Sequence, residues 1–199
     1  MRDPDNIRRV VELNPDYIGF ILYPGSKRYL GNNYKLSVEI PESISRIGVF
    51  VNALIPDVIE WVNKLGLNYV QLHGSESAEY CMELNNMDIH VIKTFSVDPQ
   101  FDFLVISDYS KWCDYFLFDT KTRLYGGSGE QFDWSILRNY TYNKPFILSG
   151  GIGPGDLKSL KQMKAPALHA IDINSKFETC PGLKDVLLIK EFITNMRSE

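Results

Sequence analysis

The stretch FILSGGIGPGDLKSLKQMKAPALHAIDINS, residues 146–175, contains one complete strand, helix and strand pattern. It opens with the apolar run Phe146–Leu148 and closes with a second run, Ala167–Ile171. Both runs are almost continuously apolar, as strands covered on both faces should be. Between them, Pro154–Met163 has the apolar spacing of an amphipathic helix. This order predicts a βαβ unit with two parallel strands.

The same alternation extends over the rest of the chain. Five further apolar runs are predicted to be buried parallel strands: Tyr17–Leu22, Arg46–Phe50, Tyr69–Leu72, His90–Lys93 and Tyr115–Phe118. Helices are predicted from Asp3-Pro4 to Leu13, over Pro56–Leu65, from Ser75 through Leu84, at Asp133–Leu137 and over Leu183–Met196. The connection Gly31–Ser45 lacks helical periodicity, so we expect it to be irregular.

The number and order of these elements define the expected fold. Seven strands with helices between them favour an α/β fold of the (β/α)8 TIM barrel type, and no strand-linked G-x-G-x-x-G motif supports a dinucleotide-binding sheet. A complete barrel has eight strands and rarely fewer than about 200 residues. The chain has 199 residues and starts at the helix cap Asp3-Pro4. We therefore expect one barrel domain over residues 1–199 that lacks strand 1.

Composition excludes several classes of protein. Hydrophobic residues make up 44% and charged residues 23%, which is typical of a globular domain and not of a disordered chain. No apolar run approaches the roughly 18 residues of a membrane helix, and no signal peptide is visible. The net charge of −4 argues against a nucleic-acid partner. Three scattered histidines and the isolated Cys81, Cys113 and Cys180 predict no metal site and no disulfide framework, so we expect a cytoplasmic location.

A carboxyl group stands where a barrel carries its chemistry, at the carboxyl end of a strand. Asp119 directly follows the apolar run YFLF. A carboxyl partly withdrawn from water there can stay protonated and donate a proton near neutral pH. The alternative is an aspartate that only caps a turn, and its position does not decide between the two roles.

Two turns with small and polar residues follow the last two predicted strands. One is Ser149-Gly150-Gly151, and the other runs from Asp172 through Asn174 to Ser175. Barrels of this type usually bind phosphate at that position, through loop amides and a helix N-terminus. Ordinary turn formation explains the same residues, so phosphate binding is an expectation with a plain alternative.

Three further residues are candidates for substrate contact. Arg28 can hold a carboxylate through its forked guanidinium, although a solvated loop arginine is the simpler interpretation. His73 follows a strand and can contact substrate or be a structural histidine. Gly127 belongs to the glycine-rich stretch Gly126–Gly129, which either closes over a ligand or connects tightly to the next helix.

Together these strings resemble one enzyme family. RDPDNI, DYIGFILYPGSKRY, IGVFVN, VQLHGSE, VIKTF, LFDTKTRLYGGSGEQFDW, LSGGI and IDINSKFETCPGLKD occur in order over nearly the whole chain. Through these strings the sequence resembles the phosphoribosylanthranilate isomerase family, aldose–ketose isomerases of tryptophan biosynthesis. The resemblance implies an Amadori rearrangement of a phosphosugar without any cofactor.

The resemblance also implies roles for individual residues. Asp119 matches the general acid, Arg28 the arginine that faces the anthranilate carboxylate, and His73 the histidine of VQLHG. Gly150, Gly151, Asn174 and Ser175 fall in the phosphate-binding turns. Where the family more often has V-D-V-S-S, this chain has Ile171-Asp172-Ile173-Asn174-Ser175, which keeps backbone donation.

The beginning of the sequence departs from the family pattern. There a short strand of the type K-x-C-G precedes M-R-D-P, and its cysteine is the general base. The sequence here starts at Met1-Arg2-Asp3-Pro4. We therefore expect strand 1 and the base to be missing, activity to be weak or absent, and the form to be a monomer or a homodimer. Only Cys180 follows a strand on the catalytic side, and it is a remote replacement for the base.

Two other interpretations remain open at this point. If the missing strand is genuine, the chain is a non-catalytic phosphosugar-binding or interaction module. A related phosphate barrel such as an epimerase would usually need clustered histidines and a metal, which the sequence lacks.

Overall fold

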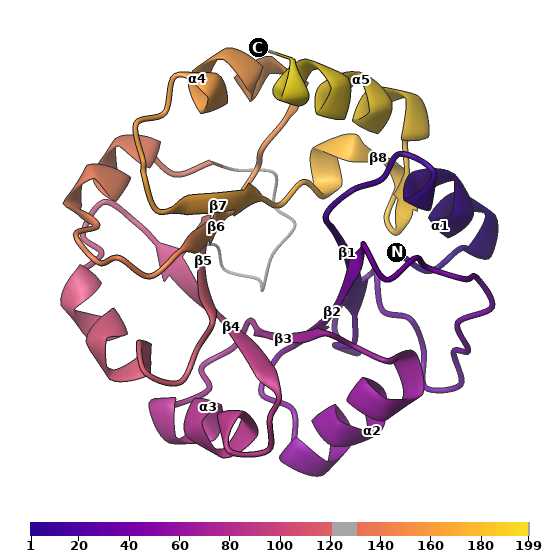
Figure 1. Cartoon of the computed structure of the whole chain (residues 1–199), viewed down its shortest axis with the longest axis horizontal. Coiled ribbons are helices and arrows are strands. Elements are labelled where there is room, and N and C mark those ends of the chain that lie inside the picture. The colour runs from indigo at the N-terminus through magenta and orange to yellow at the C-terminus, as the bar shows by residue number, and fades with distance from the viewer. Residues whose placement is uncertain (121–130, 199) are drawn as a thin grey trace.

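Seven parallel strands follow one another around a ring in the computed structural model (Figure 1), which describes residues 1–120 and 131–198. Each strand pairs with the next one along the chain, in the order β1 to β7. The strands are β1 (Tyr17–Ile21), β2 (Ser45–Phe50), β3 (Tyr69–Leu72), β4 (His90–Val97), β5 (Tyr115–Thr120), β6 (Phe146–Leu148) and β7 (Leu168–Ile171). All seven predicted strands are confirmed, with β4 extending four residues beyond its predicted end at Lys93.

Helices lie outside the ring (Figure 1). They are α1 (Pro4–Val11), α2 (Ile55–Leu65), α3 (Ala78–Asn85), α4 (Leu157–Lys161) and α5 (Val186–Arg197). Asp3 caps α1 by accepting from Asn6 N at 2.7 Å, and Gly66 ends α2 in the left-handed region at φ 59°. Within the described part of the chain, none of the helices is both long and apolar enough to cross a membrane.

Several connections are shorter or tighter than predicted. Several connections contain short 3₁₀ helices, which are η1 (Phe103–Tyr109), η2 (Trp134–Asn139), η3 (Pro154–Asp156) and η4 (Ser175–Phe177). The helix predicted over Pro154–Met163 is therefore divided between η3 and α4. The helix predicted to begin at Leu183 begins instead at Val186, because Leu183–Lys184 forms β9 and pairs antiparallel with β8, Glu178–Cys180. Gly31–Ser45 is irregular up to the start of β2, as predicted.

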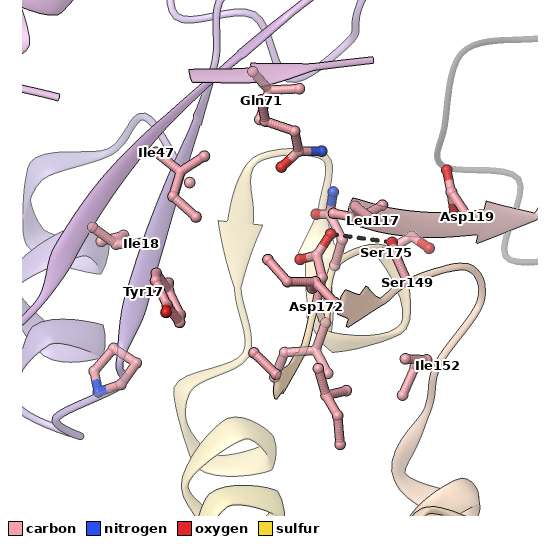
Figure 2. Close-up of a pocket in the computed structure, with 18 of the residues that line it drawn as sticks. Tyr17, Ile18, Ile47, Gln71, Leu117, Asp119, Ser149, Ile152, Asp172 and Ser175 are labelled. Carbon is pink, nitrogen blue, oxygen red and sulfur yellow. Dashed lines mark hydrogen bonds between the residues drawn. The ribbon is translucent and has the colours of Figure 1, made fainter. Parts of the chain in front are cut away.

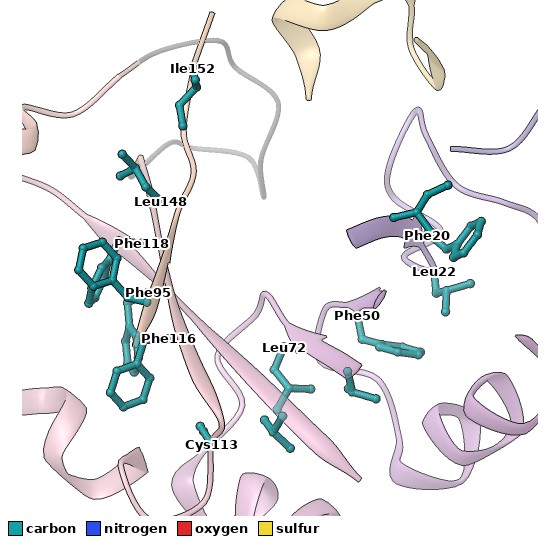
Figure 3. Close-up of a cluster of buried hydrophobic side chains, with 14 of the residues drawn as sticks. Phe20, Leu22, Phe50, Leu72, Phe95, Cys113, Phe116, Phe118, Leu148 and Ile152 are labelled. Carbon is teal, nitrogen blue, oxygen red and sulfur yellow. The ribbon is translucent and has the colours of Figure 1, made fainter. Parts of the chain in front are cut away.

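The strands bury side chains on both faces. Inside the ring, Ile47, Ile92, Leu117 and Ile147 form one buried cluster. Phe116 and Phe118, which flank Leu117 in β5, point the other way. They belong to the larger cluster between the sheet and the helices, and Figure 3 draws part of that cluster. This alternation follows from the pleat of a strand and explains why the strands are apolar along their whole length.

The two end strands of the sheet border a gap. β1 and β7 each pair with one neighbour only among the described strands, so the sheet is curled and parallel, and its closure into an eight-stranded barrel stays a prediction. Met1 lies buried at this gap, where its nitrogen donates to Gly19 O of β1 at 2.8 Å. The hairpin of β8 and β9 also lies beside the gap in Figure 1.

Candidate active site

A cavity of about 700 Å³ lies inside the ring, and residues of both β1 and β7 line it; Figure 2 draws some of its lining side chains. Every predicted site residue in the described part of the chain lines it: Arg28, His73, Asp119, Ser149, Gly150, Gly151, Asp172, Asn174 and Ser175. They come from segments far apart in sequence that all follow strands of one parallel sheet, so the carboxyl ends meet. Gly127 lies outside the described residues, and its predicted contact with substrate stays untested.

Asp119 and His73 form a pair at the carboxyl ends of β5 and β3. Asp119 is 7% exposed, and its Oδ2 lies 3.1 Å from His73 Nε2. On its other side, His73 Nδ1 lies 2.9 Å from Gln71 Nε2. The pair therefore places a carboxyl group, held by an imidazole, in the wall of the cavity, which is an arrangement suited to proton transfer. Gln71 is a residue that the sequence analysis did not select.

Gly150 allows the turn after β6 to approach this acid. Its φ is 94° and that of Gly151 is 59°, both in the left-handed region that glycine tolerates. A Cβ atom at position 150 would lie 2.7 Å from Thr120 N and 3.0 Å from Asp119 Oδ1. Any side chain here would push the turn away from Asp119, so the glycine brings the predicted anion-binding turn next to the predicted acid.

The structure leaves Asp172 no backbone donor for the phosphate contact that the sequence predicts, and that contact stays a prediction. Its backbone N donates to Leu148 O at 2.8 Å, and its carboxyl Oδ2 accepts from Ser149 Oγ at 3.1 Å. Neither group is free to donate to an anion, and a carboxylate repels phosphate. Ser149 N likewise donates to Phe118 O, so these two residues link the strand ends to each other and offer no donors to a ligand.

Burial raises the pKa of the Asp172 carboxyl. The residue keeps some surface because the cavity opens beside it, but its carboxyl is enclosed by protein. The positive charge of Lys184 opposes the rise in pKa, and the nearby carboxyl of Asp119 adds to it. The carboxyl groups of Asp172 and Asp119 and the ammonium group of Lys184 thus lie near one another at this end of the cavity.

We predict that Asp172→Asn stabilises the protein at neutral pH. When the pKa of a carboxyl is raised in the folded state, the folded protein loses stability as the pH rises above the carboxyl's pKa in the unfolded chain, about 3.9. The reason is that the carboxyl ionises less readily in the folded protein than in the unfolded chain. The variant should have a higher Tm at pH 7, and the gain should shrink as the pH approaches 4. Thermal unfolding across this range measures it, and a lower Tm at pH 7 would show that attraction to Lys184 outweighs burial.

Arg28 is engaged by a carboxylate of its own chain. Its Nε lies 2.9 Å from Glu178 Oε2, and its Nη2 lies 2.7 Å from the same oxygen. Lys184 Nζ contacts Glu178 Oε1 at 3.3 Å and Asn174 Oδ1 at 2.7 Å. Burial alone would raise the pKa of Glu178, but the hydrogen bond from Arg28 and the charge of Lys184 hold it below its usual range. Glu178 and Lys184 are thus part of the site.

Sequence reasoning missed Glu178 and Lys184 because it missed the hairpin that carries them. β8 and β9 fold the chain back so that both side chains reach the cavity. The string ETCPG contains a Pro-Gly pair, which is a turn signal flanked by short polar strands. That signal was present, whereas apolar periodicity was absent.

The cysteines lie away from the cavity. Cys180 is exposed, while Cys81 and Cys113 are buried, and none of the three lines the cavity as the described residues form it. Cys180, the remote replacement for the base, therefore has no geometric support in that role. Over residues 1–120 and 131–198, no group of three or more His, Cys, Asp or Glu side chains is placed to hold a metal ion.

The fold and the site together define an α/β protein of the barrel type, with acid–base side chains and glycine turns at the carboxyl ends of its strands. A family model described as N-(5'phosphoribosyl)anthranilate (PRA) isomerase matches residues 1–195. The N-(5'-phosphoribosyl)anthranilate isomerase of Phocaeicola vulgatus is 42% identical over 199 residues, covering 100% of this chain and 96% of the relative. That of Parabacteroides distasonis is 43% identical over 97% of this chain and 89% of its own. The chain belongs to the phosphoribosylanthranilate isomerase family.

Solved structures agree with this assignment. The crystal structure of phosphoribosyl anthranilate isomerase from Thermotoga maritima superimposes with a TM-score of 0.87 at 36% identity, covering 99% of this chain and 95% of that one. A second isomerase structure, in complex with reduced 1-(o-carboxyphenylamino)-1-deoxyribulose 5-phosphate, gives a TM-score of 0.83 at 32% identity, covering 99% of this chain and 95% of that one. The family resemblance predicted from the sequence is confirmed, whereas the predicted loss of a first strand is not, since the matches cover the whole chain.

Proposed function

We propose that this chain isomerises N-(5'-phosphoribosyl)anthranilate to 1-(2-carboxyphenylamino)-1-deoxyribulose 5-phosphate by general acid and base catalysis. The observation that carries the proposal is the Asp119–His73 pair beside the Gly150 turn in one cavity. The similarity to an isomerase that binds a reduced form of this product supports the choice of substrate.

In the proposed reaction Asp119 protonates the furanose ring oxygen, and the ring opens to a Schiff base. A base then removes the proton from C2, and the resulting enolamine tautomerises to the aminoketone. Backbone amides at Gly150 and Gly151 and around Asn174 and Ser175 hold the phosphate, and Gly127 contacts substrate. No redox, metal or organic cofactor takes part in these steps.

We further propose that the base enters on an extended segment between β1 and β7. Met1 N donates to Gly19 O, which is the bond that a parallel neighbour of β1 would make. The edges of both strands line the cavity, so a side chain from such a segment would face the substrate. The family pattern K-x-C-G gives this segment a cysteine.

Three versions of the protein test these proposals together. The chain as printed and a chain extended by a K-x-C-G strand are assayed with the anthranilate adduct, and a K-x-S-G extension serves as the matched control. General base catalysis contributes about 10²–10⁴-fold, so the cysteine extension should exceed the serine extension by that factor. If every version is inactive yet binds the product analogue, the chain is a phosphosugar-binding module and the isomerase proposal fails.

We propose a small phosphosugar as the partner, and neither a nucleic acid nor a membrane. We propose a cytoplasmic location and a monomer or homodimer. One similar Thermotoga maritima structure is described as monomers of a dimeric phosphoribosylanthranilate isomerase, which favours testing both states by light scattering.

Arg28→Ala should weaken binding of ligands that carry the aromatic carboxylate. We propose that Arg28 holds that carboxylate while Glu178 orients the guanidinium. Hydrogen bonds to charged groups contribute about 1.5–3 kcal/mol, so the Kd should rise roughly 10- to 150-fold. Calorimetry with reduced 1-(o-carboxyphenylamino)-1-deoxyribulose 5-phosphate measures it.

The matched control for this prediction is the ligand itself. The same phosphosugar carrying phenylamine without the carboxyl group should bind the wild type and Arg28→Ala almost equally. An equal loss of affinity for both ligands would mean that Arg28 acts only by neutralising Glu178.

A further inference from the structure

Three inward-facing side chains form one hydrogen-bonded chain from the end of β3 to the end of β5: Gln71, His73 and Asp119. Gln71 and His73 are two residues apart at the end of β3, so they point to the same face of the sheet. Gln71 is 6% exposed, and its amide nitrogen lies 2.9 Å from His73 Nδ1. His73 Nε2 lies 3.1 Å from Asp119 Oδ2. A buried amide at this position needs a partner, and its partner is the histidine.

The amide group determines which imidazole nitrogen carries the proton. A side-chain NH₂ group donates and does not accept, so His73 Nδ1 must present its lone pair to Gln71. In the neutral imidazole the proton is then on Nε2, which donates to Asp119 Oδ2. Oδ2 is therefore engaged as an acceptor.

The consequence concerns the proton that Asp119 is to donate. Because Oδ2 accepts from His73, the acid proton resides on Oδ1. This oxygen faces the turn at Gly150, where an added Cβ atom would lie 3.0 Å from it. In the opposite tautomer, Nε2 would accept the Asp119 proton and hold it away from the substrate. We propose that Gln71 is a positioning residue that selects the Nε2–H tautomer of His73 and thereby directs the proton of Asp119 toward the turn that holds the phosphosugar. This inference rests on the proposed isomerase function.

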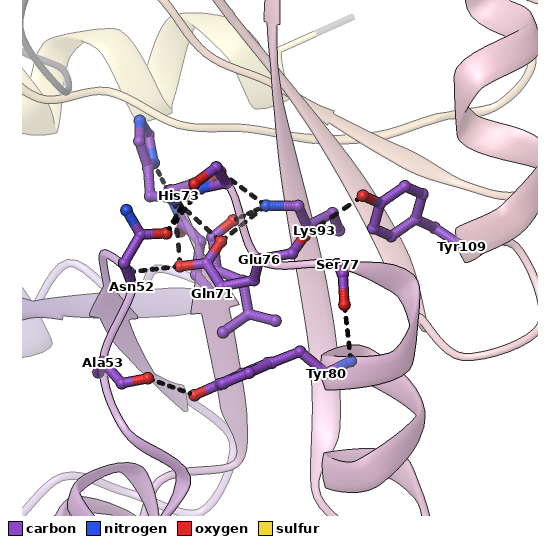
Figure 4. Close-up of polar contacts among 12 residues, drawn as sticks. Asn52, Ala53, Gln71, His73, Glu76, Ser77, Tyr80, Lys93 and Tyr109 are labelled. Atoms are coloured by element: carbon purple, nitrogen blue, oxygen red, sulfur yellow. Dashed lines mark hydrogen bonds and ion pairs between the residues drawn. The ribbon is translucent and has the colours of Figure 1, made fainter.

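The backbone around His73 is fixed by other groups, which lets Gln71 be tested in isolation (Figure 4). His73 N donates to Phe50 O at 2.8 Å. Gly74 N donates to Glu76 Oε2 at 3.0 Å, and Lys93 Nζ donates to Gly74 O at 2.8 Å. A substitution at Gln71 thus removes the contact to Nδ1 while the loop keeps its own bonds.

Two variants of nearly unchanged size separate the positioning role from packing. Q71E offers only an acceptor to Nδ1 and should move the imidazole proton from Nε2 to that nitrogen, so that Nε2 accepts from Asp119. Q71M offers neither donor nor acceptor and should leave a mixture of tautomers. The ¹⁵N chemical shifts of the His73 imidazole report the tautomer directly, and steady-state kinetics report kcat and KM. The control is Q162E, the same change at an exposed residue outside the cavity.

In the wild type we expect protonated Nε2 and unprotonated Nδ1. Q71E should shift the Nδ1 resonance to the protonated range and lower kcat at least tenfold with KM little changed, because general acid catalysis contributes about 10²–10⁴-fold. Q71M should lower kcat less, and Q162E should match the wild type. A protonated Nδ1 in the wild type, or normal turnover in Q71E, overturns the inference. If the wild type itself does not isomerise the substrate, the proposed function fails, while the ¹⁵N shifts still decide the tautomer.

Discussion

Asp119→Asn should lower kcat by about 10²–10⁴-fold, the usual contribution of a general acid, while the affinity for the product analogue stays nearly unchanged. Asparagine has the shape of aspartate, and its carbonyl oxygen can still accept from His73 Nε2, so the end of β5 should keep its structure. It has no acidic proton to give to the ring oxygen. Steady-state kinetics with the anthranilate adduct measures kcat, and calorimetry with the analogue measures the affinity.

The chain offers a matched control on the same strand. Asp114 stands just before β5 and lies 3.0 Å from His90 Nδ1, so it is a second aspartate paired with a histidine of a neighbouring strand, at the opposite end of the sheet. Asp114→Asn should leave kcat within a few-fold of the wild type. Full turnover in Asp119→Asn, or an equal loss in both variants, would contradict the assignment of the acid to the carboxyl ends of the strands.

Lys93→Met should lower the free energy of unfolding by about 3–5 kcal/mol, the range for removing one partner of a buried ion pair. Lys93 Nζ lies 2.7 Å from Glu76 Oε2, and both side chains are almost fully buried. Glu76 also accepts from Asn52 N at 2.7 Å, so it is bound in place and would be left with an uncompensated charge. Urea unfolding followed by circular dichroism measures the change.

The neutral double variant distinguishes loss of charge balance from loss of packing. Lys93→Met with Glu76→Gln removes both charges, and the glutamine oxygen can still accept from Asn52 N. It should regain much of the stability lost in Lys93→Met alone. A double variant no more stable than the single one would show that the lysine acts mainly through its hydrogen bonds to Leu72 O and Gly74 O.

The strands could be predicted from sequence because burial on both faces makes each one apolar throughout. Strands that lack this cause show no continuous apolar run. β4 continues through Thr94 and Ser96, which interrupt the apolar run although they pair with β5. β8 and β9 are too short and polar to show apolar periodicity. The second half of the predicted helix Pro154–Met163 is helical, but its first turn is tightened into η3.

The site was partly predictable for a related reason. Residues that follow strands must meet in a parallel sheet, so Asp119, His73 and Gly150 could be placed together from their positions alone. Gln71 lies inside a strand, where a sequence indicates burial but not which side chain turns inward next to an acid. The backbone donors that remain after the strands pair depend on strand register, as the bond from Asp172 N to Leu148 O shows. Single-sequence patterns do not specify register.

The two parts of the site differ in their mechanical support. The acid and its imidazole stand on β5 and β3, well inside the row of paired strands, and Ser149 N ties the adjoining turn to Phe118 O at 2.9 Å. Arg28, Glu178 and Lys184 come instead from segments that follow the two outermost strands. Movement of β1 and β7 apart would weaken the contacts of Arg28, Glu178 and Lys184 with the ligand. Asp119 and His73 would keep their positions, so affinity and proton transfer can be changed by separate parts of one ring.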